Sequence, residues 1–284
     1  MKELLTKKIP NASSVVIVLP EEVDVDLYGS ASVLYTYILQ LHKKVFLISK
    51  KDIDQKYFVI PWIDKAKKTI PKHVDLILTC KDELISNQEN IVLETYRKNV
   101  ICLTQLLFEV MKSLHVKINP KMATALYSGL IVRTDMFSLK EVDGIIFALA
   151  KELIELGADH KNVVKYLQKY STLSQLRLLG KMLSEMELLL DARVACFSVS
   201  YELLKQCGAT YKDCDVAVQK ALELPTVKFS VLIVEMEDLT IRGSIESHQV
   251  ESVQKNVEFE SIISLQEAKE KILEKVKEIE TKEQ

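Results

Sequence analysis

Apolar residues in the first part of the chain alternate between short continuous runs and helical spacing. The runs have the length and the β-branched, aliphatic character of buried strands. They are Val15–Leu19, Lys44–Ser49, Asp75–Cys80 and Asn90–Glu94. Between the first two, Tyr28–Lys43 has its apolar side chains at helical spacing. Strands that alternate with helices predict an α/β layer built on a parallel sheet.

Helical spacing then continues from Ile101 to about Asp191. The predicted helices are Ile101–Val116, Pro120–Arg133, Ser138–Leu156, Asn162–Tyr170 and Leu173–Leu190. The third of them opens with a capping box, Ser138-Leu139-Lys140-Glu141, and Gly157 follows it as the expected C′ residue. These helices are expected to cover one side of the sheet and to lead into the next unit.

The pattern changes again near Arg193. The predicted elements are a strand at Val194–Val199, helices at Tyr201–Gln206 and Asp213–Leu224, and a hairpin of Lys228–Met236 with Leu239–Ser244. A second capping box, Ser264-Leu265-Gln266-Glu267, opens a final helix with a narrow apolar stripe of Ile272, Val276 and Ile279. The prediction is an α/β fold with a parallel-sheet domain under helical cover, residues 1–185, and a smaller α/β domain, residues 190–284.

Composition narrows the class of protein. The chain has 284 residues, of which 48% are hydrophobic and 27% charged, as in soluble globular proteins. A formal net charge of −2 excludes a globally basic nucleic-acid binder, although not a local basic cleft. No aliphatic run approaches the length of about 20 residues that spans a membrane, and the 5 scattered cysteines are typical of reduced thiols. We therefore expect a cytoplasmic protein without membrane association.

One acidic motif stands between the first predicted strand and the helix after it, where open α/β sheets bind ligands. It reads Asp24-Val25-Asp26-Leu27-Tyr28-Gly29-Ser30. Two aspartates one residue apart can converge on a hard divalent cation such as Mg²⁺ or Mn²⁺. The alternative is an acidic loop in which Asp26 or Ser30 caps the helix.

This order of elements and motif resembles the DHH phosphoesterase superfamily. The most similar branch is the nano-RNase/oligoribonuclease and pAp-phosphatase type, with its DHH-associated C-terminal domain. Leu106–Arg133, Glu152–Asp159 and Phe229–Ser247 resemble further parts of that branch. The resemblance covers nearly the whole chain. It implies two domains and Mn²⁺-dependent hydrolysis of short oligonucleotides or nucleotide phosphates in a cleft between them.

The residues that this resemblance assigns to the metal centre are mostly replaced. Asp24 and Asp26 match, but the histidine before them is Pro20, and the positions of two further aspartates hold Lys81 and Arg133. We expect Lys81 or Arg133 to neutralise the two aspartates where the ions would lie.

The Asp-His-His motif is also missing after the fourth predicted strand. Carboxylates that would serve as metal ligands after a shift of register are Asp82, Glu94 and Asp135. In the second domain, the glycine-rich phosphate loop is absent, and Glu246 stands where the branch has an arginine.

Two hypotheses follow. The first is a phosphoesterase-like protein with a degraded metal site and weak or no hydrolysis, which keeps a nucleotide-binding or protein-interaction role and needs no cofactor. The second is an active Mn²⁺-dependent phosphodiesterase or phosphatase acting on short oligonucleotides or nucleotides. The candidate partners are a nucleotide, a short oligonucleotide and a second copy of the chain. The second hypothesis requires three or more carboxylates within about 5 Å of one another, whereas the first requires a cation among them.

Overall fold

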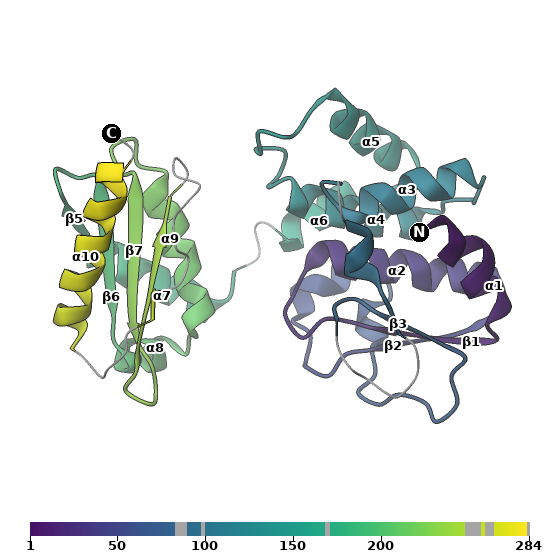
Figure 1. The fold of residues 1–284 in the computed structure, drawn as a ribbon, viewed down its shortest axis with the longest axis horizontal. Coiled ribbons are helices and arrows are strands. Elements are labelled where there is room, and N and C mark those ends of the chain that lie inside the picture. The colour runs from purple at the N-terminus through teal and green to yellow at the C-terminus, as the bar shows by residue number, and fades with distance from the viewer. Residues whose placement is uncertain (83–89, 98–99, 168–170, 248–256, 259–263, 283–284) are drawn as a thin grey trace. The chain divides into compact units, whose positions relative to one another are not determined.

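The computed structural model describes residues 1–82, 90–97, 100–167, 171–247, 257–258 and 264–282. It separates into two compact units, Met1–Tyr170 and Ser171–Gln284. The first unit holds a parallel sheet in the order β2-β1-β3-β4, and the second holds a mixed sheet in the order β5-β6-β7-β8-β9 (Figure 1). The predicted α/β class, with a parallel sheet followed by a second sheet domain, is confirmed.

The first sheet forms from the four predicted apolar runs. Its strands are β1 (Ser14–Val18), β2 (Lys44–Ile48), β3 (Leu76–Thr79) and β4 (Asn90–Val92). Alternate side chains bury opposite faces of the sheet: Val15 and Ile17 join the main core, while Val16 and Val18 join a second cluster. Because the strands are parallel, the residues that follow each of them lie along one edge of the sheet.

The helices of the first unit pack mainly over one face of that sheet, where Figure 1 shows α2, α3 and α4. The helices are α2 (Val25–Gln40), α3 (Leu103–Ser113), α4 (Pro120–Arg133), α5 (Gly144–Glu155) and α6 (His160–Leu167). Short helical turns are η2 (Gln55–Val59), η3 (Ile63–Lys65) and η4 (Leu93–Arg97). The sequence pattern did not predict the N-terminal π-helical turn η1 (Leu4–Lys8) and α1 (Ile9–Asn11), whose Leu4, Leu5 and Ile9 are buried in the core.

The capping box at Ser138 does not begin a helix, contrary to the prediction. The chain turns here instead: Asp135, Met136 and Phe137, directly before Ser138, have φ values of 44°, 54° and 68°, in the left-handed region. The Ser138 hydroxyl donates to the carbonyl of Asp135 within this turn. Helix α5 begins at Gly144, capped by the Asp143 carboxylate, which accepts from the N–H groups of Ile145 and Ile146. The predicted C′ glycine, Gly157, is confirmed by its φ of 93°.

Helices α2 and α4 pack closely because glycines stand at their contact. A Cβ at Gly29 of α2 would lie 2.5 Å from the carbonyl oxygen of Ala125 in α4, and one at Gly129 of α4 would lie 3.1 Å from Cα of Asp26 in α2. No van der Waals contact is as short as 2.5 Å, so a larger residue at Gly29 must push the helices apart.

We therefore expect Gly29→Ala to lower the free energy of unfolding by about 1–3 kcal/mol, the usual cost of overpacking. Thermal or urea unfolding measures the change. The matched control is Gly144→Ala in the same unit, where an added Cβ meets nothing within 4 Å. An equal effect of the two substitutions would contradict the close approach of α2 and α4.

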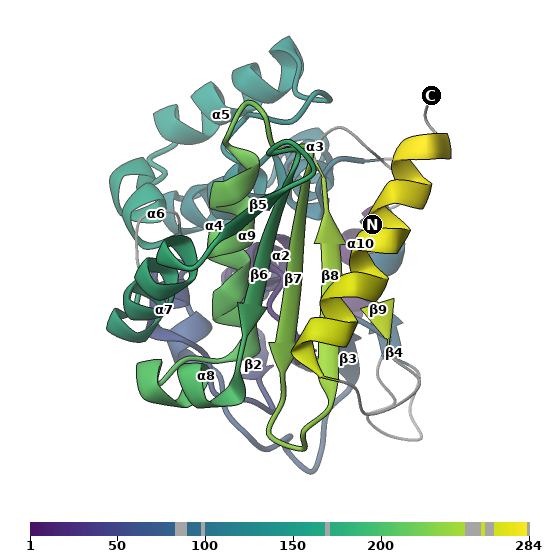
Figure 2. The same cartoon turned by 90° about the vertical axis from the view of Figure 1, so that its left-hand side faces the viewer.

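The second unit places helices on both faces of its sheet. The strands are β5 (Glu187–Leu189), β6 (Val194–Val199), β7 (Phe229–Glu235), β8 (Ile241–Glu246) and β9 (Val257–Glu258). The helices are α7 (Leu173–Ser184), α8 (Tyr201–Cys207), η5 (Tyr211–Cys214), α9 (Asp215–Leu222) and α10 (Leu265–Lys282). Figure 2 shows α10 on one face of the sheet and α7 and α9 on the other. The capping box of α10 forms as predicted, since Ser264 and Glu267 each bond to the backbone N–H of the other.

The division between the units lies earlier in the chain than the sequence pattern placed it. Helix α7, assigned to the first domain by the pattern, packs into the core of the second unit. Leu178 and Met182 of α7 share one buried cluster with Phe197 and Leu204. The end of the predicted helix Leu173–Leu190 is strand β5, which pairs with β6.

Candidate functional site

Asp24 begins helix α2. Its backbone is extended, with φ −131° and ψ 109°, and its carboxylate accepts from the N–H of Leu27 at 3.1 Å. Asp24 is therefore the N-cap. The expectation that Asp26 or Ser30 caps this helix is wrong, because the helix starts earlier than its apolar spacing indicates and both residues lie inside it.

Asp26 is fully buried and serves a different helix. Its Oδ2 accepts from the N–H of Leu103 at 2.7 Å, and its Oδ1 accepts from the N–H and the hydroxyl of Thr104, both at 2.9 Å. Helix α3 starts at Leu103, and its own N-cap residue, Cys102, provides no side-chain cap. Asp26 thus satisfies the first N–H groups of α3, where the helix dipole favours a negative charge.

Arg97 is the cation that neutralises the two aspartates. It lies at the end of η4, directly after strand β4. Its Nη2 is 2.8 Å from Oδ2 of Asp24, and its Nε is 3.7 Å from Oδ2 of Asp26. The guanidinium is only 14% exposed, so water screens these pairs weakly. Burial acts to lower the pKa of Arg97, but Asp24, Asp26 and Glu94 raise it above its ordinary value.

Neither cation expected at this position occupies it. Lys81 lies 4.0 Å from the Glu22 carboxylate, and the exposed Arg133 donates from its Nε to the Ile101 carbonyl. The sequence pattern missed Arg97, although Arg97 follows the carboxyl end of a parallel strand just as Asp24 does. Its place after a predicted parallel strand is the sequence feature that could have identified Arg97 as a partner of Asp24.

The further candidate ligands do not gather with Asp24 and Asp26, except for one. Glu94 lies 3.5 Å from Nη2 of Arg97 and so joins the cluster through that cation. Asp82 is exposed after β3, and the carboxylate of Asp135 accepts from the Ser138 hydroxyl of its own turn.

These residues do not fit a divalent metal ion. Both oxygens of Asp26 accept hydrogen bonds, and burial raises the pKa of its carboxyl group in spite of those bonds and of Arg97. The guanidinium of Arg97 lies where a cation would have to contact Asp24. Burial, with a smaller effect of Asp26, raises the pKa of the neighbouring Cys102 thiol to about 11. Among the described residues, no group of three or more histidine, cysteine, aspartate or glutamate side chains could hold a metal ion.

The second unit has acidic side chains at the end of β8. The Glu246 carboxylate accepts from Nε2 of Gln219 at 2.5 Å. Burial and the nearby Glu246 raise the pKa of Asp215, which begins α9. Two neighbouring carboxylates give this position a negative potential.

The fold is similar to that of a solved structure, the exopolyphosphatase-related protein of Bacteroides fragilis. The TM-score is 0.81 at 20% sequence identity, over 98% of this chain and 96% of that one. The chain therefore shares the fold of that protein. No family model matches the sequence, and the search of curated proteins gives no match.

Two weaker similarities are to other solved structures. One is a protein of Methanococcus jannaschii assigned as a family II inorganic pyrophosphatase, at 13% identity, TM-score 0.45, and 86% and 93% coverage of the two chains. The other is exonuclease RecJ bound to manganese, at 11% identity, TM-score 0.39, and 87% and 80% coverage. At these scores neither carries an argument.

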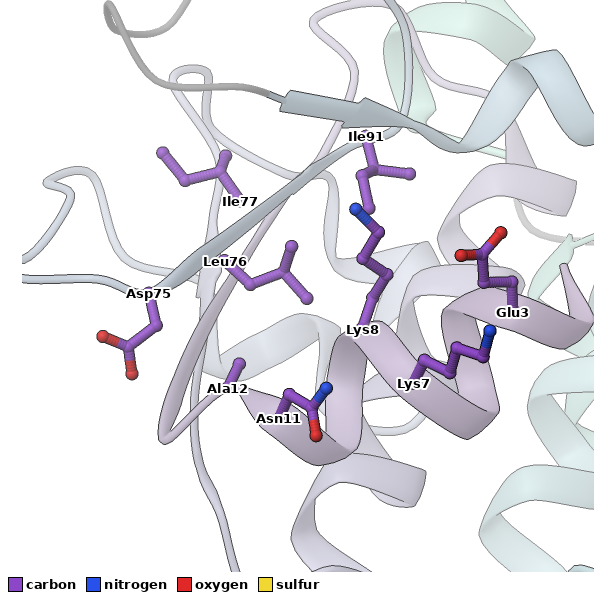
Figure 3. Close-up of a pocket in the computed structure, with 9 residues that line it drawn as sticks. All are labelled: Glu3, Lys7, Lys8, Asn11, Ala12, Asp75, Leu76, Ile77 and Ile91. Carbon is purple, nitrogen blue, oxygen red and sulfur yellow. The ribbon is translucent and has the colours of Figure 1, made fainter.

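A cavity of about 650 Å³ lies elsewhere in the first unit (Figure 3). Its lining includes Lys7 and Lys8 of the N-terminal turn and Asp75 and Leu76 at the start of β3. Asp75 precedes its strand, so this cavity is at the amino ends of the strands and not at the carboxyl edge that bears Asp24. The Oδ2 atom of Asp75 accepts from the N–H groups of Ser13 and Ser14, which ties this carboxylate to the start of β1.

Proposed function

We propose that this chain is a phosphoesterase-like protein that keeps the DHH-like fold without metal-dependent hydrolysis and acts by binding a nucleotide or a protein partner. The observation that carries the proposal is the position of Arg97. An arginine paired with Asp24 and close to Asp26 supplies the positive charge that two metal ions supply in a two-metal phosphoesterase. Unlike those ions, it cannot activate a water molecule.

The hydrogen bonds of Asp26 support the same proposal. A metal ligand needs a lone pair directed at the ion, whereas both carboxylate oxygens of Asp26 accept N–H groups of helix α3. Recruiting Asp26 to a metal would therefore leave the first turn of that helix without its acceptor. Asp24 and Glu94 alone provide few of the roughly six oxygen ligands that such ions prefer.

The second unit supports a protein partner over a phosphorylated ligand. Glu246 and Asp215 repel a phosphate at the position where the resembling branch has an arginine. A chain without the means to hold phosphate in one unit or to hydrolyse it in the other is better suited to binding a protein. We also propose a cytoplasmic location, because all five cysteines are described, buried and not joined by disulfides.

Two measurements on the purified chain test this function. We expect no Mn²⁺-dependent cleavage of a short RNA above a blank without protein. We also expect no rise in melting temperature when Mn²⁺ is added at millimolar concentration, because a ligand stabilises only the state that binds it.

The competing function is an active Mn²⁺-dependent phosphodiesterase. It predicts cleavage and a metal-dependent rise in melting temperature, both lost in Asp24→Asn. Either result in the wild type would replace the proposed function.

In the described residues, none of the helices is both long and apolar enough to cross a bilayer.

A further inference from the structure

An apolar cavity lies at the opposite end of the α2–α4 pair from Asp26. Gly129, near the end of α4, approaches Asp26, whereas Gln40 at the end of α2 bonds to Met122 near the start of α4. The cavity is at this second end and has a volume of about 570 Å³, within the range of roughly 300–1,000 Å³ typical of small-molecule sites. The residues that form it include Leu39, Gln40, Trp62, Asn119, Pro120 and Lys121.

Trp62 forms one wall and is held firmly in an unusual backbone conformation. Its φ is 70°, in the left-handed region that bulky residues rarely adopt. The indole Nε1 donates to the Thr36 hydroxyl at 3.0 Å, and the Ser32 hydroxyl donates to the preceding carbonyl, that of Pro61, at 2.6 Å. Strain that is held in place by such bonds is found preferentially at ligand sites.

The charge at the cavity is positive. The Lys121 ammonium lies 4.0 Å from the centre of the Trp62 ring. Among the described residues, Lys121 is the one charged residue of the lining. The cavity in Figure 3 differs in this respect, because Glu3 and Asp75 offset Lys7 and Lys8 there.

We propose that this cavity binds a small hydrophobic carboxylate. The apolar chain would lie against Leu39, Trp62 and Pro120, and the carboxylate would pair with the Lys121 ammonium. Apolar walls with one convergent charged group are the usual composition of a small-molecule site. The inference does not depend on the proposed function, since the cavity shares no residue with the Asp24–Asp26–Arg97 cluster.

Trp62 is the only tryptophan of the chain, so its fluorescence reports on the cavity directly. The probes are octanoate, 1-octanol and octylammonium, which share an alkyl chain and differ in the charge of the head group. We expect a saturable change in Trp62 emission with octanoate. Octanol should bind about three- to tenfold more weakly, because it lacks the pairing with Lys121, and octylammonium more weakly still.

Two variants separate the contribution of the Lys121 charge to binding from that of the apolar wall. Lys121→Gln should bind octanoate and octanol equally, and Leu39→Asp should weaken the binding of both. The matched control is Lys165→Gln, since Lys165 also stands over an aromatic ring, 5.1 Å from the centre of Tyr166, but outside the cavity. It should leave all three titrations unchanged.

Three results would overturn the proposal: no saturable signal with octanoate, equal affinity for the three probes, or octanoate binding that Lys121→Gln does not weaken. Circular dichroism of each variant establishes that it is folded before titration. Because Lys121 is exposed and Lys121→Gln keeps the length of the side chain close to the original, this variant remains informative if Leu39→Asp fails to fold.

Discussion

Asp26→Asn is expected to destabilise the first unit by about 2–4 kcal/mol, the cost of leaving buried donors and a buried charge without their partner. Asparagine has the shape of aspartate but only one acceptor oxygen. It cannot accept from both the Leu103 and the Thr104 N–H groups, because in the wild type these groups bond to different oxygens of Asp26. It also removes a negative charge 3.7 Å from Arg97.

The measurement is thermal unfolding followed by circular dichroism. For a unit of this size, each kcal/mol corresponds to roughly 2–4 °C in melting temperature, so a fall of roughly 5–15 °C is expected. The matched control is Asp143→Asn, since Asp143 also accepts two backbone N–H groups at a helix start but is exposed. That variant should lose no more than about 0.5 kcal/mol, because one oxygen of Asp143 accepts both N–H groups and asparagine caps a helix about as well as aspartate. Equal losses in the two variants would mean that the burial of Asp26 adds nothing.

The strands and most of the helices could be predicted from the sequence because their signals are local. Helix α4 begins and ends where the pattern placed it, since Asn119 caps its start and Pro120 stands at its first position. The four apolar runs became the four parallel strands for the same reason. The turn at Asp135–Phe137 was missed because left-handed backbone at three non-glycine residues has no sequence signature.

The candidate site could be predicted only in part, because its decisive contacts join distant segments. The sequence singled out Asp24 and Asp26, which the structure places together beside Arg97. It did not identify Arg97, which lies 73 positions from Asp24 and meets it only because β1 and β4 end at the same edge of the sheet.

One local feature of the sequence indicates that Asp26 caps helix α3. Helix α3 begins after Cys102, a residue that does not cap helices, so its first N–H groups needed an acceptor from elsewhere in the fold. Of the two aspartates that follow β1, Asp24 is engaged by its own helix, which leaves Asp26.

Arg97→Met is the complementary test, because it removes the cation and leaves the carboxylates. Methionine fills a similar volume, so the main loss is the charge that offsets buried Asp26 and partly buried Asp24. Breaking one side of such a pair should cost about 3 kcal/mol, somewhat less than for a fully buried pair because Asp24 is 19% exposed. Arg97→Lys should recover part of this loss, since it keeps the charge but not the second N–H of the guanidinium. Arg133→Met, the removal of an exposed arginine, should change stability by no more than about 0.5 kcal/mol.

The same three variants distinguish a cation-filled site from a metal site. If Arg97 takes the place of the metal, Mn²⁺ should raise the melting temperature of Arg97→Met, whose carboxylates have lost their cation. It should leave the wild type, Arg97→Lys and Arg133→Met unchanged. The rise should be small, about 1 kcal/mol at a Mn²⁺ concentration several times the dissociation constant, because Asp26 still accepts the N–H groups of α3. Stabilisation of the wild type by Mn²⁺, abolished in Asp24→Asn, would instead show that Arg97 moves aside for the ion and that the chain retains a metal centre.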